Sequence, residues 1–147
     1  MYIITFILSF IPFIISSFTF RMDPIYYNSL HKPTFIMNNN LHSFIWIVIF
    51  ILLSISITIC FKKNKNKDYL YTVISNYISI YLFLITFFNL KSPLFGVLMN
   101  ISVCISSIFL YIETKKISKK SSYLIIPYIL MNIYSLTISI LILSMNL

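Results

Sequence analysis

The sequence predicts an all-α fold: an integral membrane bundle of five transmembrane helices. Five apolar stretches, each about 20 residues long, match the length that a helix needs to cross a hydrocarbon core of about 30 Å. The 147 residues include only eleven Lys and Arg and three Asp and Glu, and the mean hydropathy is +0.93. Segments such as 45–59 lack the strict alternation of a membrane β-strand. We therefore expect helices rather than a barrel.

The apolar stretches are expected to form a single transmembrane domain over residues 1–147. The first stretch, 2–20, has no basic residue before it and no small-residue cleavage site after it, so we predict a retained helix rather than a signal peptide. Nearly all charged residues lie between the stretches, because a charge in mid-membrane is costly unless it is paired or hydrated. The predicted spans, in order, are 2–20, 41–61, 69–90, 94–112 and 123–145.

The connections between the spans divide the basic residues unequally. Loop one, 21–40, is the longest, and loops two, three and four are 62–68, 91–93 and 115–122. Loops two and four hold eight Lys, whereas the other side holds Arg21, Lys32 and Lys91. The positive-inside rule then places the N-terminus in the cytoplasm and loop one outside. Lysines beside spans indicate contact with anionic membrane lipid, and we expect no nucleic-acid partner.

Residue types that serve catalysis or metal binding are few and scattered along the chain. They are Asp23, Asp68, Glu113, His31, His42, Cys60 and Cys104. No two carboxylates are placed for acid–base work, and neither His has a Cys or carboxylate at ligand spacing. The single glycine excludes a glycine-rich phosphate loop. We therefore expect neither an enzyme nor a metal site, and we interpret His31 and His42 as interfacial polar residues.

Polar residues at helical spacing mark one face of three predicted spans. In the last span this face holds Tyr128, Asn132, Ser135 and Ser139, and in the fourth it holds Asn100, Cys104, Ser107 and Tyr111. In the third span it holds Ser75, Ser79, Thr86 and Asn89. Polar side chains in lipid turn toward protein or a cavity. Two interpretations stay open: hydrogen bonds that join helices, or a shared polar and aromatic pocket.

Loop one carries a run of aromatic and conformationally restricted residues. It contains the segment Tyr26-Tyr27-Asn28-Ser29-Leu30-His31-Lys32-Pro33. Pro33 restrains the residue before it to extended backbone, so the loop is expected to hold a fixed bend. Trp46 follows inside the second span, and Phe50 shares its helix face. An aromatic loop of fixed shape above a helix bundle is a candidate lid.

These residues resemble the signature of the TspO family, also called translocator protein or tryptophan-rich sensory protein. The family pattern is Trp-Tyr-x-x-Leu-x-Lys-Pro, then a Pro-Pro pair, then a Trp in the second helix. The chain matches it at Tyr27, Leu30, Lys32, Pro33 and Trp46. Tyr26 replaces the first Trp of the pattern, and Met37-Asn38 replace the Pro-Pro pair.

The start of the last span is similar to the family's Leu-Leu-x-Pro-Tyr motif, and here it reads Leu124-Ile125-Ile126-Pro127-Tyr128. The family's next Trp, Phe and Asn fall on Met131, Tyr134 and Ser139. Segment 81–88 keeps only the apolar frame of the family's third-helix motif. The resemblance covers the whole chain in span number and loop order, and its specific motifs lie in 26–46 and 124–139.

The resemblance implies a five-helix bundle, paired as a homodimer, with a pocket beneath loop one. Such a pocket would bind porphyrins and other tetrapyrroles, or sterol-like and drug-like apolar molecules. Apart from porphyrin as a ligand, no cofactor is expected. The residues that we predict to contact the ligand are Tyr27, Lys32, Pro33, Trp46, Phe50, Tyr81, Phe88, Tyr128, Met131, Ser135 and Ser139.

One departure from the family and two alternatives limit this interpretation. Porphyrin breakdown in the family depends on a pair of pocket tryptophans, and Trp46 is the only one here, so we predict binding without efficient breakdown. We expect a multi-pass protein of the cell membrane in a bacterium, and of the mitochondrial outer membrane or another host membrane otherwise. The alternatives are a pocketless membrane modulator, for example a viral one, and a small channel lined by the polar stripes.

Overall fold

The computed structural model describes residues 2–20, 23–64 and 67–147, and within them every regular element is helical. The elements in order are α1 (Tyr2–Thr19), α2 (Pro24–Ser29), α3 (Asn39–Lys63), α4 (Lys67–Leu84), the π-helix η1 (Ile85–Asn89), α5 (Pro93–Ile117), α6 (Lys119–Tyr123) and α7 (Ile126–Met145). Five helical segments are long and apolar enough to cross a membrane. The predicted all-α, five-span fold is therefore confirmed.

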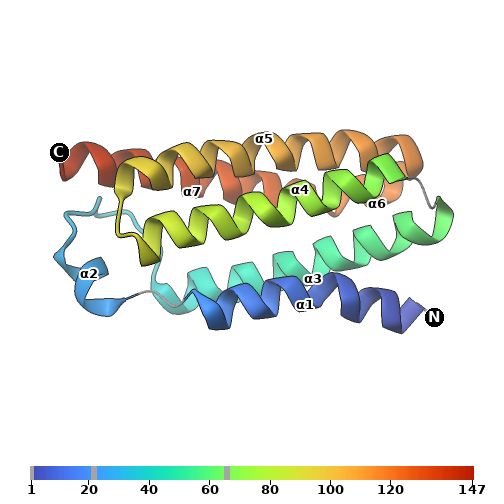
Figure 1. The fold of residues 1–147 in the computed structure, drawn as a ribbon, viewed down its shortest axis with the longest axis horizontal. Helices are drawn as coiled ribbons and strands as arrows, with labels where there is room; N and C mark the ends of the chain where they lie inside the picture. Colours follow the sequence, from blue (N-terminus) through green and yellow to red (C-terminus); the bar gives the residue numbers. More distant parts are fainter. Residues whose placement is uncertain (1, 21–22, 65–66) are drawn as a thin grey trace.

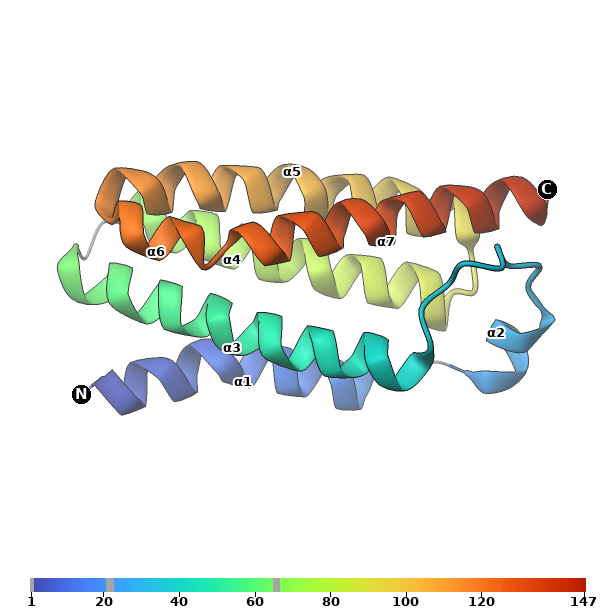
Figure 2. The ribbon, with the colours of Figure 1, turned by 180° about the vertical axis from the view of Figure 1, so that it is seen from behind.

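The long helices run side by side in two groups, with α1 and α3 in one and α4, α5 and α7 in the other (Figures 1 and 2). The closest packing lies within the groups, between α4 and α5, α5 and α7, and α1 and α3. Loop one, α2 and the C-terminus lie at one end of the bundle, opposite the N-terminus (Figure 1). This end is called the loop-one end below, and the other the lysine-rich end.

The lysine-rich end differs from the sequence prediction in loop four. Residues 115–122 were expected to form a loop, but α5 continues to Ile117 and α6 begins at Lys119, so this segment is almost entirely helical. The helix can extend beyond the hydrocarbon because Lys115 and Lys116 lie in its last turn, where cations favour the helix dipole. Arg21 and Lys65, which entered the charge comparison, lie outside the described residues.

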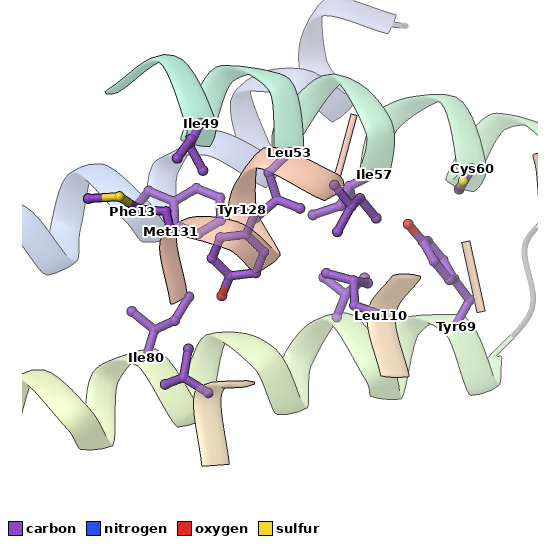
Figure 3. Packing of buried hydrophobic residues seen from close by; sticks show 13 residues of the cluster. Phe13, Ile49, Leu53, Ile57, Cys60, Tyr69, Ile80, Leu110, Tyr128 and Met131 are labelled. Atoms are coloured by element: carbon purple, nitrogen blue, oxygen red, sulfur yellow. The ribbon is translucent and has the colours of Figure 1, made fainter. Parts of the chain in front are cut away.

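The half of the bundle nearest the lysine-rich end has a solid interior. Ile57, Leu110 and Tyr69 point toward one another between α3, α4 and α5 (Figure 3), and each has at most 1% of its surface exposed. The Thr114 hydroxyl donates to the Tyr69 hydroxyl over 3.4 Å, and Cys60 is buried beside them. This packing closes the bundle at one end.

Polar side chains connect the three helices of the larger group. The Asn76 amide nitrogen on α4 donates to Ser106 Oγ on α5 over 2.9 Å, and the Tyr128 hydroxyl on α7 donates to Asn76 Oδ1 over 3.1 Å. Asn76 and Tyr128 are each at least 99% buried. In lipid, association of helices depends on packing and on such hydrogen bonds, because the hydrophobic effect does not drive helices together there.

The polar face predicted for the third span does not form as one buried stripe. Ser79 is buried, but Ser75 and Asn89 are exposed, and the inward amide is that of Asn76. The π-helix between Ile85 and Asn89 changes the helical phase, so residues on either side of it no longer share a face. The stripes of the last two spans do turn inward, at Asn100, Ser107, Asn132 and Ser139 among others.

Replacing Asn76 by Ala is expected to destabilise the bundle by about 1 kcal/mol, because two interhelical hydrogen bonds at about 0.6 kcal/mol each are lost. Equilibrium unfolding in mixed micelles measures the effect. Ser75→Ala, at an exposed neighbouring position, is the matched control and should leave stability unchanged. Equal stability of both variants and the wild type would show that the network contributes nothing.

Candidate functional site

A cavity of about 480 Å³ lies in the loop-one half of the bundle, between the two groups of helices. Its wall includes residues from α1, loop one, α3, α4, η1, α5 and α7. Among the described residues that line it there is no Lys, Arg, Asp or Glu. The cavity is therefore suited to an uncharged, mostly apolar ligand body.

Trp46 on α3 lies on the cavity wall and packs among other rings. Its ring centre is 5.2 Å from that of Phe50 and 6.2 Å from that of Tyr128. The indole Nε1 donates to His42 Nε2, one helical turn earlier, over 3.1 Å. This bond requires an unprotonated Nε2, so His42 is in its neutral form in this arrangement. Contacts with His42, Phe50 and Tyr128 therefore hold the indole in place at the cavity.

Amide and hydroxyl groups of α5 and α7 form the polar part of the wall. The Asn100 amide nitrogen donates to Ser139 Oγ over 3.0 Å, and Ser139 Oγ donates to the backbone oxygen of Ser135 over 2.9 Å. Asn132 also lines the cavity with only 2% of its surface exposed. Among the described residues, its buried amide nitrogen has no hydrogen-bond partner. The stripes thus both join helices and line a cavity.

The π-helix η1 places Phe87 and Phe88 on the wall. Its wider turn is closed by the bond from Leu90 N–H to the backbone oxygen of Ile85, over 2.9 Å. Phe87 packs directly on Gly96 of α5, where an added Cβ would lie only 2.6 Å from Phe87 Cδ2. The single glycine of the chain therefore makes room for an aromatic side chain of the cavity.

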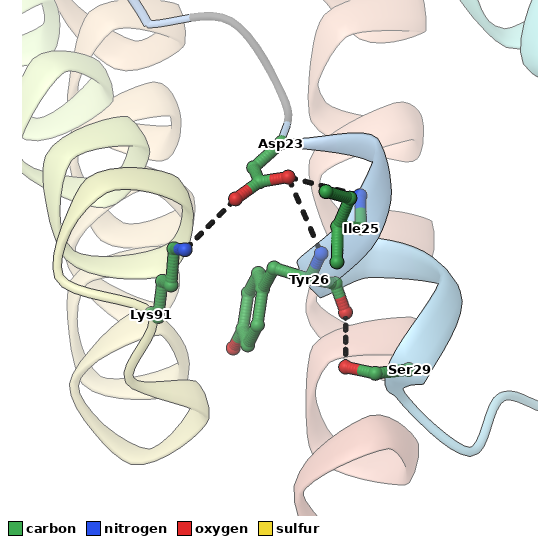
Figure 4. A network of polar contacts seen from close by, with 5 residues as sticks. All are labelled: Asp23, Ile25, Tyr26, Ser29 and Lys91. Carbon is green, nitrogen blue, oxygen red and sulfur yellow. Dashed lines mark hydrogen bonds and ion pairs between the residues drawn. The ribbon is translucent and has the colours of Figure 1, made fainter.

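Loop one forms the roof, and its short helix α2 begins at a strong cap. Asp23 accepts hydrogen bonds from the backbone N–H groups of Ile25 and Tyr26 over 2.9 and 3.3 Å, and it pairs with Lys91 Nζ over 2.8 Å (Figure 4). The Lys91 hydrogen bond, followed by the two backbone bonds, lowers the pKa of Asp23. Pro24 occupies the first turn, where a missing N–H costs nothing.

Two further contacts fasten loop one to α7. The Tyr134 hydroxyl accepts a hydrogen bond from the backbone N–H of Met37 over 3.0 Å. The Asn146 side chain accepts from the backbone N–H of His31 over 2.9 Å and donates to the His31 oxygen over 2.8 Å. With the Asp23–Lys91 pair, loop one is therefore held at three separate points.

The structure places the predicted contact residues in two groups. Those on the cavity wall are Tyr27, Trp46, Phe50, Phe88, Ser135 and Ser139. Those away from it are Lys32, Pro33, Tyr81, Tyr128 and Met131. Their roles as ligand contacts stay predictions.

Each residue away from the wall has another environment. Lys32 Nζ lies 4.3 Å from the ring centre of Tyr27 and donates to the Tyr27 backbone oxygen. The Tyr81 hydroxyl donates to the Pro12 backbone oxygen on α1 over 2.7 Å. Tyr128 and Met131 belong to the buried core. Lys32 therefore lies beside a residue of the wall without reaching the cavity itself.

Sequence reasoning did not select His42, Phe87 or Asn100 as contacts, although all three line the cavity. His42 precedes Trp46 by one turn, a spacing that places both on one helix face. Asn100 was part of a predicted polar face. For Phe87 the sequence offers no local signal, because its position depends on the π-helix and on Gly96.

Comparison with known proteins gives a consistent result. The sequence model described as the TspO/MBR family matches residues 3–144. The uncharacterized membrane protein YtaB of Bacillus subtilis is 32% identical over 145 residues, which are 97% of this chain and 94% of that protein. The tryptophan-rich protein TspO of Bacillus cereus is 30% identical over 146 residues, which are 98% of this chain and 95% of that protein.

Replacing Gly96 by Ala is expected to displace Phe87 and to destabilise the fold by about 1 to 3 kcal/mol, as overpacking does. Thermal unfolding in detergent measures the loss. Adding Phe87→Leu to Gly96→Ala should recover part of it, because the smaller side chain relieves the contact. Unchanged stability of Gly96→Ala would contradict the close packing seen here.

The α2 cap and its ion pair should weaken in acid. Because the pKa of Asp23 is lowered on folding, their contribution is present above the usual aspartate range and is lost as the pH falls through the lowered value. Protection of the backbone amides of residues 25–29, measured as exchange rates relative to the intrinsic rates at each pH, should fall accordingly. Asp23→Asn keeps a capping oxygen but loses the ion pair, and Asp23→Ala loses both, so at neutral pH exchange should be slowest in the wild type and fastest in Asp23→Ala. An identical acid response in Asp23→Asn would refute this assignment.

Proposed function

The chain belongs to the TspO/MBR family, and we propose that this multi-pass membrane protein reversibly binds a porphyrin or another flat, apolar ligand in the cavity beneath loop one. The observation that carries the proposal is an uncharged cavity of about 480 Å³ with Trp46, Phe50, Phe87 and Phe88 on its wall. Aromatic faces at a cavity offer stacking surfaces to a flat ring system.

The physical source of affinity depends on where the ligand starts. From water, burial in the cavity contributes about 25 cal/mol for each Å² of apolar surface. From lipid that term largely cancels, and stacking on rings and hydrogen bonds must favour the cavity over acyl chains. The amide and hydroxyl groups of Asn100, Asn132 and Ser139 would then orient the ligand.

Lys32 places a cation near the roof for an acidic edge on the ligand. Lys32 Nζ lies over the ring of Tyr27, and Tyr27 belongs to the cavity wall. A porphyrin whose ring occupies the cavity could place its carboxylates toward loop one and Lys32. This arrangement keeps the charges at the membrane boundary, where their hydration is retained.

The channel alternative finds little support in the packing. A pore must continue through the bundle, but the lysine-rich half is filled by residues such as Leu110 and Tyr69, both 0% exposed. No observation specifically favours a pocketless modulator. The choice of membrane and the pairing into a homodimer are predictions that the family resemblance supplies.

Protoporphyrin is expected to quench Trp46 fluorescence in a saturable titration, because the only indole of the chain lies on the cavity wall. Phe50→Ala should weaken binding several-fold by removing a ring beside the indole. Phe44→Ala is the matched control, since Phe44 is 64% exposed and absent from the wall. Equal weakening in both variants, or linear quenching without saturation, would count against a specific site.

Illumination of the bound complex should not cause fast loss of the porphyrin Soret band. The proposal rests on the single indole, with Met131 at the position where the family has a second pocket tryptophan. Met131→Trp provides the complementary variant, with folding checked by thermal unfolding. Rapid bleaching by the wild type, in excess of free porphyrin in the same micelles, would disprove binding without breakdown.

A further inference from the structure

The residues of the cavity wall differ in how far they are exposed on the outside of the bundle. Most are buried or half-buried, but Ser17 on α1 and Asn39, Ser43 and Ile47 on α3 are exposed. A residue that lines a cavity and is also exposed marks a place where the cavity reaches the surface. Ile47, for example, is 54% exposed.

These residues lie along the seam between α1 and α3. The rings of Phe13 and Phe50 stack across this seam with centres 4.3 Å apart. Ser17 follows Phe13 by one turn, and Ile47 precedes Phe50 by about one turn. Because α1 and α3 run antiparallel (Figure 1), both steps lead toward loop one, and the rise per residue then brings Ser17 and Ile47 to about the same level. Ser43 continues the same side of α3 one turn further.

Between Phe13 and loop one, the side chains of Ser17 on α1 and Ser43 on α3 are small and fill little of the space between the two helices. Ser17 Oγ donates to the backbone oxygen of Phe13 over 2.9 Å, so its hydroxyl is turned back on its own helix. Phe20, the next large side chain of α1 on the wall, packs on Tyr81 of α4 with ring centres 5.5 Å apart. The ring stack of Phe13 and Phe50 joins α1 to α3 at the edge of this part of the seam that is farther from loop one.

The other boundaries of the cavity are bridged by specific contacts. Between α1 and α4, the hydroxyls of Tyr77 and Tyr81 donate to the backbone oxygens of Ser9 and Pro12, each over 2.7 Å. Between α3 and α7, Trp46 packs on Tyr128. Loop one is fastened at three points, and the lysine-rich half is solid. What distinguishes the α1–α3 seam among the described residues is that the exposed residues of the cavity wall lie along it.

We propose that ligand passes between the bilayer and the cavity sideways, through the α1–α3 seam at Ser17, Ser43 and Ile47. This inference rests on the proposed function and specifies its ligand class: a membrane-dissolved amphiphile with an uncharged apolar body, rather than a molecule taken up from water. The opening begins at Asn39, the first residue of α3, so the polar edge of such a ligand can stay at the membrane boundary while its body slides inward.

The test measures the rate of Trp46 quenching in a stopped-flow experiment, with protoporphyrin added to the full chain in lipid nanodiscs. Ser17→Phe narrows the seam and should slow uptake and release several-fold. Ile47→Ala widens it and should speed both uptake and release. Ile15→Phe, at a position 48% exposed and on another face of α1, should match the wild type. Asn146→Ala, which releases one fastening of loop one, should also leave the rates unchanged.

The opposite pattern would overturn the proposal: faster exchange in Asn146→Ala, with wild-type rates in both Ser17→Phe and Ile47→Ala, would show passage through the roof. If Ser17→Phe abolishes equilibrium quenching by filling the cavity, Ile47→Ala alone decides between the routes. Failure of the proposed function is distinguishable, because then the wild type itself would show no saturable quenching.

Discussion

The structure depends above all on the need of every polar group in a bilayer to find a partner within the protein. Lipid offers no hydrogen bonds, and the amides of Asn76, Asn100 and Asn132 on the apolar helices are buried inside the bundle, although Asn89 is exposed. Asn76, Tyr128 and Ser106 meet between α4, α5 and α7 and join these helices. Nearer loop one, Asn100 and Ser139 meet in the same way but also border a cavity. One constraint thus accounts for both the packing and the polar part of the candidate site.

The two halves of the bundle differ in packing, because one has a filled interior and the other holds the cavity. Toward the lysine-rich end, fully buried side chains such as Leu110 and Tyr69 fill the space between the helices. The α1–α3 pair and the other three long helices are joined by fewer contacts than the helices within each group, and toward loop one the cavity lies between them. Gly96 and the π-helix contribute there by bringing Phe87 to the wall. Loop one covers the cavity. It is fastened to Lys91, between η1 and α5, and to Tyr134 and Asn146, on α7 and just after it.

The sequence predicted the number and type of the long helices because hydropathy over about 20 residues is a strong signal in membrane proteins. It did not predict α2, although Asp23 followed by Pro24 combines a favourable N-cap with a favourable first-turn residue. A family motif led to Trp46 and helical spacing led from it to Phe50, and both line the cavity. Tyr128 matched a motif equally well but points toward Asn76, and that choice depends on a partner distant in sequence. The π-helix likewise has no local sequence signature. The position of Phe87 within it depends on packing against Gly96 of the next helix.

The most direct measurement of the central claim, a hollow bordered by Trp46 inside the bundle, compares two quenchers of that indole in the same nanodiscs. Lipids with brominated acyl chains quench an indole that faces the bilayer, whereas protoporphyrin in the cavity quenches one that faces inward. The account predicts weak quenching by brominated lipid and strong, saturable quenching by protoporphyrin. Strong quenching by brominated lipid together with no saturable effect of protoporphyrin would place the indole against acyl chains and contradict the account.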